Sequence, residues 1–212
     1  MSRKKYVALF AVIALVALVT TAFSAPSTGR RPVRVKVFAP EKGHVVGVEG
    51  RGWIVDLEAK FRGVDLAATG SQLELTGPGD HQTAPPFPSP FSPGKDDAFP
   101  GLIVVMPTTT IGAGPGQNLA GLFNLVGVTD RDDDETEIWA TWIVGAPLFG
   151  VDTDTAIFVA VADDLDGNGI YDDAPDVVPD VNGDGRINRL DLRAYGVASN
   201  IVKVKFHITG AP

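Results

Sequence analysis

Aspartate, asparagine and glycine are concentrated in residues 163–191, and this stretch constrains the chain more than any other. Its second half runs from Asp180 to Asp191 with the sequence DVNGDGRINRLD. Counted from Asp180, oxygen-bearing side chains stand at positions 1, 3, 5, 9 and 12, and Gly185 stands at position 6, where a calcium loop turns sharply. Because calcium takes about six to eight oxygen ligands, this spacing predicts a calcium loop, with the backbone carbonyl of Arg186 as the ligand at position 7. The alternative is an ion-free turn rich in Asx residues, which explains the glycine but not the spacing of the oxygens.

Residues Asp180 to Leu192 (DVNGDGRINRLDL) resemble the dockerin-type calcium loop, a relative of the EF-hand. The resemblance covers about 13 of the 212 residues, and the rest of the chain is not recognised as belonging to a known family. It implies that a short helix follows the loop. It also implies a set of calcium ligands: Asp180, Asn182, Asp184, Asn188 and Asp191.

A second, incomplete loop precedes the first in the chain. Asp164, Asp166, Asn168 and Gly169 fit positions 1, 3, 5 and 6, the carbonyl of Ile170 falls at position 7, and Asp172 fits position 9. Position 12 is Pro175, which has no carboxylate, so Asp173 or Asp176 is the expected substitute. Pro175 and Pro179 also exclude a helix after this loop. We therefore expect a second calcium ion here, but no dockerin-like binding of a cohesin.

Composition agrees with cation binding outside the cell. The chain has no cysteine and therefore no disulfide. Metal ions are then the remaining cross-links that could stabilise an exported fold. Residues 130–191 hold 17 acidic and three basic residues, in a chain whose net charge is −8. Such a segment attracts divalent cations and repels nucleic acid, so no nucleic-acid partner is expected.

The N-terminus has the pattern of a signal peptide over residues 1–25. Three basic residues precede an apolar run from Tyr6 to Val19, and small residues follow it. This pattern predicts a protein that is secreted or displayed at the cell surface; the alternative is that the segment stays uncleaved as an anchor. No second apolar run is long enough to span a membrane, so no span is expected after cleavage.

Short apolar runs predict strands through the rest of the chain. In residues 52–61, alternate side chains from Trp53 to Phe61 fall on one face, and 102–106 is apolar throughout, as in a buried strand. Residues 119–128 predict either a short helix or a strand, and residues 188–195 a helix ended by Gly196. The other expected strands are residues 33–38, 44–48, 73–75, 138–144, 155–162 and 201–208.

These elements predict an all-β fold, either an Ig-like or a jelly-roll β-sandwich, of roughly seven to nine strands. Residues 30–212 are expected to form a single domain, with residues 163–191 as a calcium-ordered connection between two of its strands. Proline recurs through residues 77–101, which predicts an irregular loop. The acidic residues 129–137 predict a hairpin tip, with a third cation site as the alternative.

No catalytic constellation is recognisable, so the chain is not expected to be an enzyme. It has three histidines without metal-binding spacing, no cysteine and no nucleophile-elbow motif. The favoured function is a non-catalytic, secreted or surface-associated calcium-binding protein in adhesion or extracellular assembly, with self-association or a cell-surface polysaccharide as partner. The alternatives are a carbohydrate-binding module, for which Trp53, Trp139 and Trp142 are candidate sugar-stacking residues, and a secreted hydrolase with paired carboxylates in a cleft.

Overall fold

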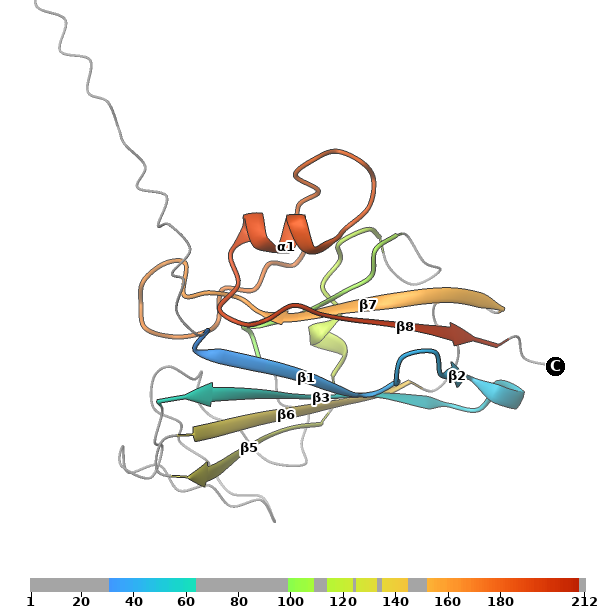
Figure 1. Cartoon of the computed structure of the whole chain (residues 1–212), viewed down its shortest axis with the longest axis horizontal. Coiled ribbons are helices and arrows are strands. Elements are labelled where there is room, and N and C mark those ends of the chain that lie inside the picture. The colour runs from blue at the N-terminus through green and yellow to red at the C-terminus, as the bar shows by residue number, and fades with distance from the viewer. Residues whose placement is uncertain are drawn as a thin grey trace, which may run out of the picture. The chain divides into compact units, whose positions relative to one another are not determined.

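Eight strands and one α-helix form within the residues that the computed structural model describes (Figure 1), namely 31–63, 99–108, 114–123, 125–132, 135–144 and 152–209. The residues from Arg31 onward group into one compact unit. The strands are β1 (Val33–Ala39), β2 (Val45–Val46), β3 (Trp53–Arg62), β4 (Leu102–Val105), β5 (Leu125–Asp132), β6 (Glu135–Val144), β7 (Thr153–Val161) and β8 (Val202–Ile208). The helix is α1 (Arg189–Tyr195), and two short 3-10 turns span Val48–Gly50 and Ala120–Leu122.

The strands make two four-stranded sheets, in the orders β1-β3-β6-β5 and β2-β8-β7-β4. Neighbouring strands are antiparallel, apart from the short parallel pairing of β2 with β8. Both sheets contribute to one large buried cluster. The predicted β-rich fold with a single short helix is thus confirmed for the described residues.

The alternation predicted for β3 places its apolar side chains in this cluster. Trp53, Val55, Leu57, Ala59 and Phe61 are all buried there. The matching positions of β8, Val204 and Phe206, enter the same cluster from the other sheet. Period-two alternation on a half-buried strand therefore located the inward faces of both sheets.

β4 is buried on both of its faces, which explains why its sequence does not alternate. Leu102 and Val104 belong to the cluster between the sheets. Ile103 and Val105 face the other way and belong to a second buried cluster with Phe158 of β7. The covering side chains are Val178, Ile187 and Leu192, all from the connection between β7 and β8. The aspartate-rich segment therefore packs onto the outer face of the β2-β8-β7-β4 sheet (Figure 1).

Several predicted bounds differ from the observed ones. The strand expected over 44–48 is only two residues long, because Gly47 has φ 71° and the chain then enters a 3-10 turn. Residues 119–128 divide into a 3-10 turn and the start of β5. The acidic residues 129–137 lie where β5 passes into β6, with Asp132 and Glu135 paired across the two strands, as a hairpin requires. The strand expected over 73–75 and most of the proline-rich stretch lie outside the described residues, as does the N-terminal 1–25 segment. None of the helices in the described ranges is long and apolar enough to cross a bilayer.

Candidate metal centre

The loop that begins at Asp180 is closed by hydrogen bonds from its own backbone. The Asp180 carboxylate accepts from the N–H of Gly183, at 2.9 Å, and of Gly185, at 2.6 Å. The Asn182 side-chain oxygen accepts from Asp184 N–H at 3.0 Å, and the Asp184 carboxylate accepts from Arg186 N–H at 2.8 Å. The loop thus gathers the side-chain oxygens of positions 1, 3 and 5 around one turn of backbone.

The loop that begins at Asp164 repeats this arrangement. The Asp164 carboxylate accepts from Asn168 N–H at 3.0 Å and from Gly169 N–H at 2.8 Å. Asp166 accepts from Asn168 N–H at 3.0 Å, and Asn168 accepts from Ile170 N–H at 2.7 Å. Two segments sixteen residues apart therefore fold into the same loop, although only the second matched the full pattern.

Glycine makes this shared turn possible. In both loops the residues at positions 4 and 6 have left-handed backbone conformations: φ is 73° and 85° at Gly167 and Gly169, and 68° and 75° at Gly183 and Gly185. Residues with a Cβ rarely adopt such angles, so the repeated glycines fix the path of the backbone. That path brings the backbone N–H groups within reach of the first carboxylate.

A carboxylate from further along the chain closes each loop. In the second loop it is Asp191, which is fully buried and accepts from Val181 N–H at 3.1 Å and Asn188 N–H at 2.7 Å. In the first loop it is Asp173, which accepts from the N–H of Leu165 at 2.6 Å and of Asp166 at 3.0 Å. Of the two substitutes expected for Pro175, the structure therefore brings Asp173 into the loop.

Carboxylates converge most closely in the first loop. Oxygen atoms of Asp164, Asp166 and Asp173 lie within 4.8 Å of one another, whereas Asp172 is not in this group. In the described part of the chain, no lysine, arginine or histidine forms an ion pair with an acid of either loop. Three carboxylates at this separation repel one another in the absence of a cation, and a divalent cation would neutralise them.

The remaining predicted ligands have other roles as well. Asn188, at position 9 of the second loop, is the N-cap of α1, and its side-chain oxygen accepts from Leu190 N–H at 2.7 Å. Asp191 completes a capping box with it, so loop closure and helix initiation use the same two side chains. The predicted helix end is confirmed, because Gly196 follows α1 with φ 114° and donates its N–H to Leu192 O.

The segment is fastened to the sheet by backbone contacts. Ile187 N–H donates to Pro107 O at 2.9 Å, and Val178 N–H donates to Gly116 O at 2.8 Å. A Cβ on Gly101 or Gly116 would meet the carbonyl oxygens of Tyr171 and Val178 respectively. These close approaches hold the two loops against β4 and its flanking residues.

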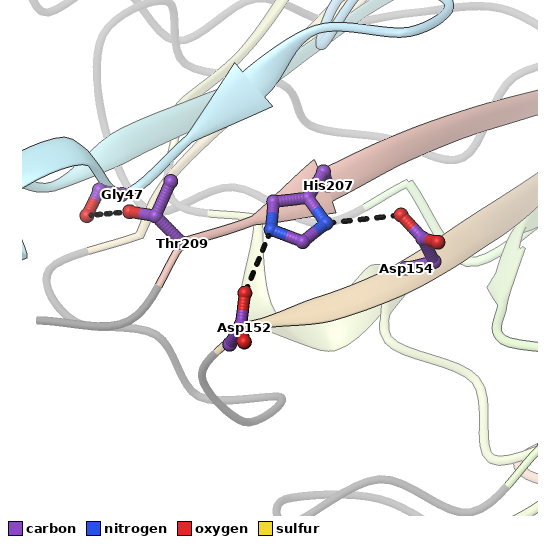
Figure 2. Close-up of polar contacts among 5 residues, drawn as sticks. All are labelled: Gly47, Asp152, Asp154, His207 and Thr209. Atoms are coloured by element: carbon purple, nitrogen blue, oxygen red, sulfur yellow. Dashed lines mark hydrogen bonds and ion pairs between the residues drawn. The ribbon is translucent and has the colours of Figure 1, made fainter.

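A histidine between two aspartates lies at the far end of β7 and β8 (Figure 2). His207 Nδ1 is 2.9 Å from Asp154 Oδ1, and its Nε2 is 3.4 Å from Asp152 Oδ1. His207 and Asp154 face each other in the β7–β8 register. This group was not predicted from the sequence, because the cross-strand pairing joins residues 53 positions apart.

The tryptophans and the carboxylates on which the two alternative functions would depend have structural roles in the described residues. Trp53 and Trp142 are 7% and 6% exposed and belong to the buried cluster, so neither offers a face for sugar stacking; the side chain of Trp139 lies outside the described part. Glu58 and Glu137 are buried carboxylates away from the loops, and Lys60 Nζ lies 3.7 Å and 3.8 Å from them as a shared counter-charge. Neither glutamate lines the cavities on the β2-β8-β7-β4 sheet.

Comparisons with protein-family models, with curated proteins and with solved structures find no match to this chain.

Proposed function

We propose that this chain is an exported, non-catalytic calcium-binding protein in which two calcium ions order the connection between β7 and β8. The observation that carries the proposal is the repeated loop. Two segments share the same backbone-to-side-chain hydrogen bonds, and each is closed by a further carboxylate. The absence of paired basic side chains among the described residues leaves these acids suited to a hard cation.

The proposed ligands follow from this geometry. In the second loop they are Asp180, Asn182, Asp184, Asn188 and Asp191, with the carbonyl of Arg186. In the first loop they are Asp164, Asp166, Asn168 and Asp173, with the carbonyl of Ile170. Asp173 rather than Asp176 is the closing ligand, because its oxygen lies near those of Asp164 and Asp166, and Asp172 is left out because it does not belong to that group.

Calcium has a structural task in this proposal. The loops cover Ile103, Val105 and Phe158 on the outer face of a sheet, so opening them would expose that cluster to water. Mutual repulsion among the acids favours opening, and bound cations oppose it. At free calcium about ten times the dissociation constant, each site adds about 1.4 kcal/mol to the free energy of unfolding.

We further propose that the two sheets form an Ig-like β-sandwich rather than a jelly roll. With the strands lettered along the chain, and β1 and β2 as the two halves of strand A, β1-β3-β6-β5 reads A-B-E-D and β8-β7-β4 reads G-F-C. This is the strand order of an Ig constant-type domain. The calcium segment then occupies the F–G connection, a loop position from which many such domains bind partners, which fits a role in adhesion or extracellular assembly.

Thermal unfolding tests the calcium role. The chain from residue 26 onward would be melted with millimolar calcium, with millimolar magnesium and with chelator, beside Asp180→Ala, Asp164→Ala and the matched control Asp163→Ala. We expect calcium to raise the melting temperature of the parent by roughly 3–6 °C per site. Each loop variant should lose the increase that belongs to one site, and the control should keep the full increase. Equal melting temperatures in calcium and chelator would refute the proposal.

A further inference from the structure

Five positively charged side chains line two adjoining hollows on the β2-β8-β7-β4 sheet. The hollows measure about 590 and 460 Å³, and Lys42, Lys203 and Lys205 line both. Arg186 completes the lining of the first and Arg189 that of the second. We call these five residues and the surface between them the basic groove. The volume of each hollow lies in the range of ligand-binding sites.

The five basic side chains reach the groove from separate parts of the chain. Lys203 and Lys205 are alternate residues of β8 whose side chains are exposed, while Val204 and Phe206 point into the core. Lys42 precedes β2, which pairs with β8, and Gly43 N–H donates to Lys205 O at 2.8 Å. Arg186 and Arg189 come from the second loop and the first turn of α1. Residues about 160 positions apart are thus brought together.

These cations lack acidic partners. None of the five forms an ion pair within the described residues. Among the described residues, Asp154 is the one carboxylate that lines either hollow, and it contacts His207 (Figure 2). The acids of the neighbouring loop accept hydrogen bonds from their own backbone instead. The groove therefore concentrates positive charge on a chain whose net charge is −8.

Lys203, which lines both hollows, is affected by the neighbouring positive charges. Lys203 Nζ lies 4.7 Å from the centroid of the Phe158 ring, in cation–π geometry. Partial burial, and after it the charges of Lys205, Arg186 and Arg189, lower the pKa of Lys203. An anion in the groove would relieve this repulsion.

We propose that the basic groove binds an anionic polysaccharide, a chain bearing carboxylate or sulfate groups along its length. A polymer with repeated anionic groups matches cations spread over two joined hollows better than a single small anion does. Single-stranded nucleic acid is disfavoured, because Phe158 and Phe206 are buried and offer no face on which a base could stack. The groove rests on the proposed function in one respect, because Arg186 and Arg189 belong to the segment that the proposed calcium ions order.

Fluorescence anisotropy with labelled oligosaccharides tests the proposal on the chain from residue 26 onward. The probes are a heparin fragment, a polygalacturonate fragment, a neutral dextran fragment and a DNA oligonucleotide, all at low salt and fixed millimolar calcium. The variants are Lys203→Gln with Lys205→Gln, and separately Arg186→Gln. The matched control is Lys36→Gln, because Lys36 is an exposed strand lysine 4.0 Å from the ring centroid of Phe38, outside the groove.

We expect at least one anionic glycan to bind, the dextran not to bind, and affinity to fall as salt rises. The double variant should weaken binding by about tenfold and Arg186→Gln by roughly threefold, with the control unchanged. Melting temperatures and calcium titrations of the double variant and of the Lys36→Gln control should match the parent, which separates a lost groove from a lost calcium site. The proposal is overturned if neither anionic glycan binds, if the control weakens binding as much as the double variant, or if DNA binds as tightly as the glycans.

Discussion

The hydroxyl of Tyr195 donates a hydrogen bond to the backbone carbonyl of Asp173 across 2.5 Å. Tyr195 ends α1, which starts from the closing residues of the second loop, and Asp173 closes the first. Burial, and after it the charge of Asp173, raises the pKa of Tyr195, so the phenol keeps its proton and remains a donor at neutral pH. The two proposed calcium sites are thus joined by one side chain.

Tyr195→Phe should therefore weaken the first site more than the second. Loss of one hydrogen bond costs about 1 kcal/mol, or about fivefold in calcium affinity if all of it appears there. Calcium titration calorimetry measures the effect, with Tyr171→Phe as control, because the Tyr171 ring packs on Phe61 and its hydroxyl makes no hydrogen bond among the described residues. Equal calcium affinities in the parent and Tyr195→Phe would show that the loops act separately.

Ile187→Ala should loosen the whole segment from the sheet. Ile187 is 1% exposed and lies between the second loop and the outer face of β4 and β7. Truncation of a buried isoleucine costs about 2–4 kcal/mol, and denaturant unfolding measures it. Leu190→Ala is the matched control, because Leu190 is 53% exposed in the same segment and should change stability by less than about 0.5 kcal/mol. A similar loss in both variants would contradict the packing described for this face.

Gly101→Ala tests the close approach of the segment to the sheet. The added methyl group would meet the carbonyl of Tyr171, a backbone atom that cannot move without shifting the first loop. Overpacking of this kind costs about 1–3 kcal/mol. Gly121→Ala adds the same methyl group where no atom lies within 4 Å and should be neutral. If Gly101→Ala and Gly121→Ala have the same free energy of unfolding, the backbone of Tyr171 does not pack closely against Gly101.

Asp191→Ala should destabilise the protein even in chelator. Asp191 is fully buried, and its two oxygens accept the N–H groups of Val181 and Asn188. Loss of both acceptors and of the capping box should cost roughly 2–3 kcal/mol without any ion present. Denaturant unfolding in chelator measures this loss of stability separately from the calcium contribution. Asp176→Ala is the control, because Asp176 is exposed. If Asp191→Ala matches its parent in chelator, the carboxylate has no structural role apart from an ion.

Much of the fold follows from local patterns. Alternation located β1, β3 and β8 to within a residue at each end, and the unbroken apolar run of β4 indicated burial on both sides. The helix was expected from the dockerin resemblance and its end from Gly196, because a C-terminal cap depends on residues close in sequence.

Features that join distant residues did not follow from the sequence. The sequence left the closing residue of the first loop open between Asp173 and Asp176, because the choice depends on how the backbone turns before Pro175 and not on spacing alone. The basic groove depends on the pairing of β2 with β8 and on the docking of the second loop, neither of which is written in a local motif. The outer face of β4 is covered by the connection between β7 and β8. This contact joins residues far apart in the sequence, so it could be identified only in the folded structure.

Calcium stoichiometry by equilibrium dialysis tests the central claim most directly. The parent chain should bind two calcium ions, and Asp164→Ala and Asp180→Ala should each bind one. Asp163→Ala should still bind two, because the Asp163 carboxylate lies outside both proposed ligand sets. No bound calcium at millimolar concentration, or a count of two that survives both loop substitutions, would contradict the proposal that these loops are the calcium sites.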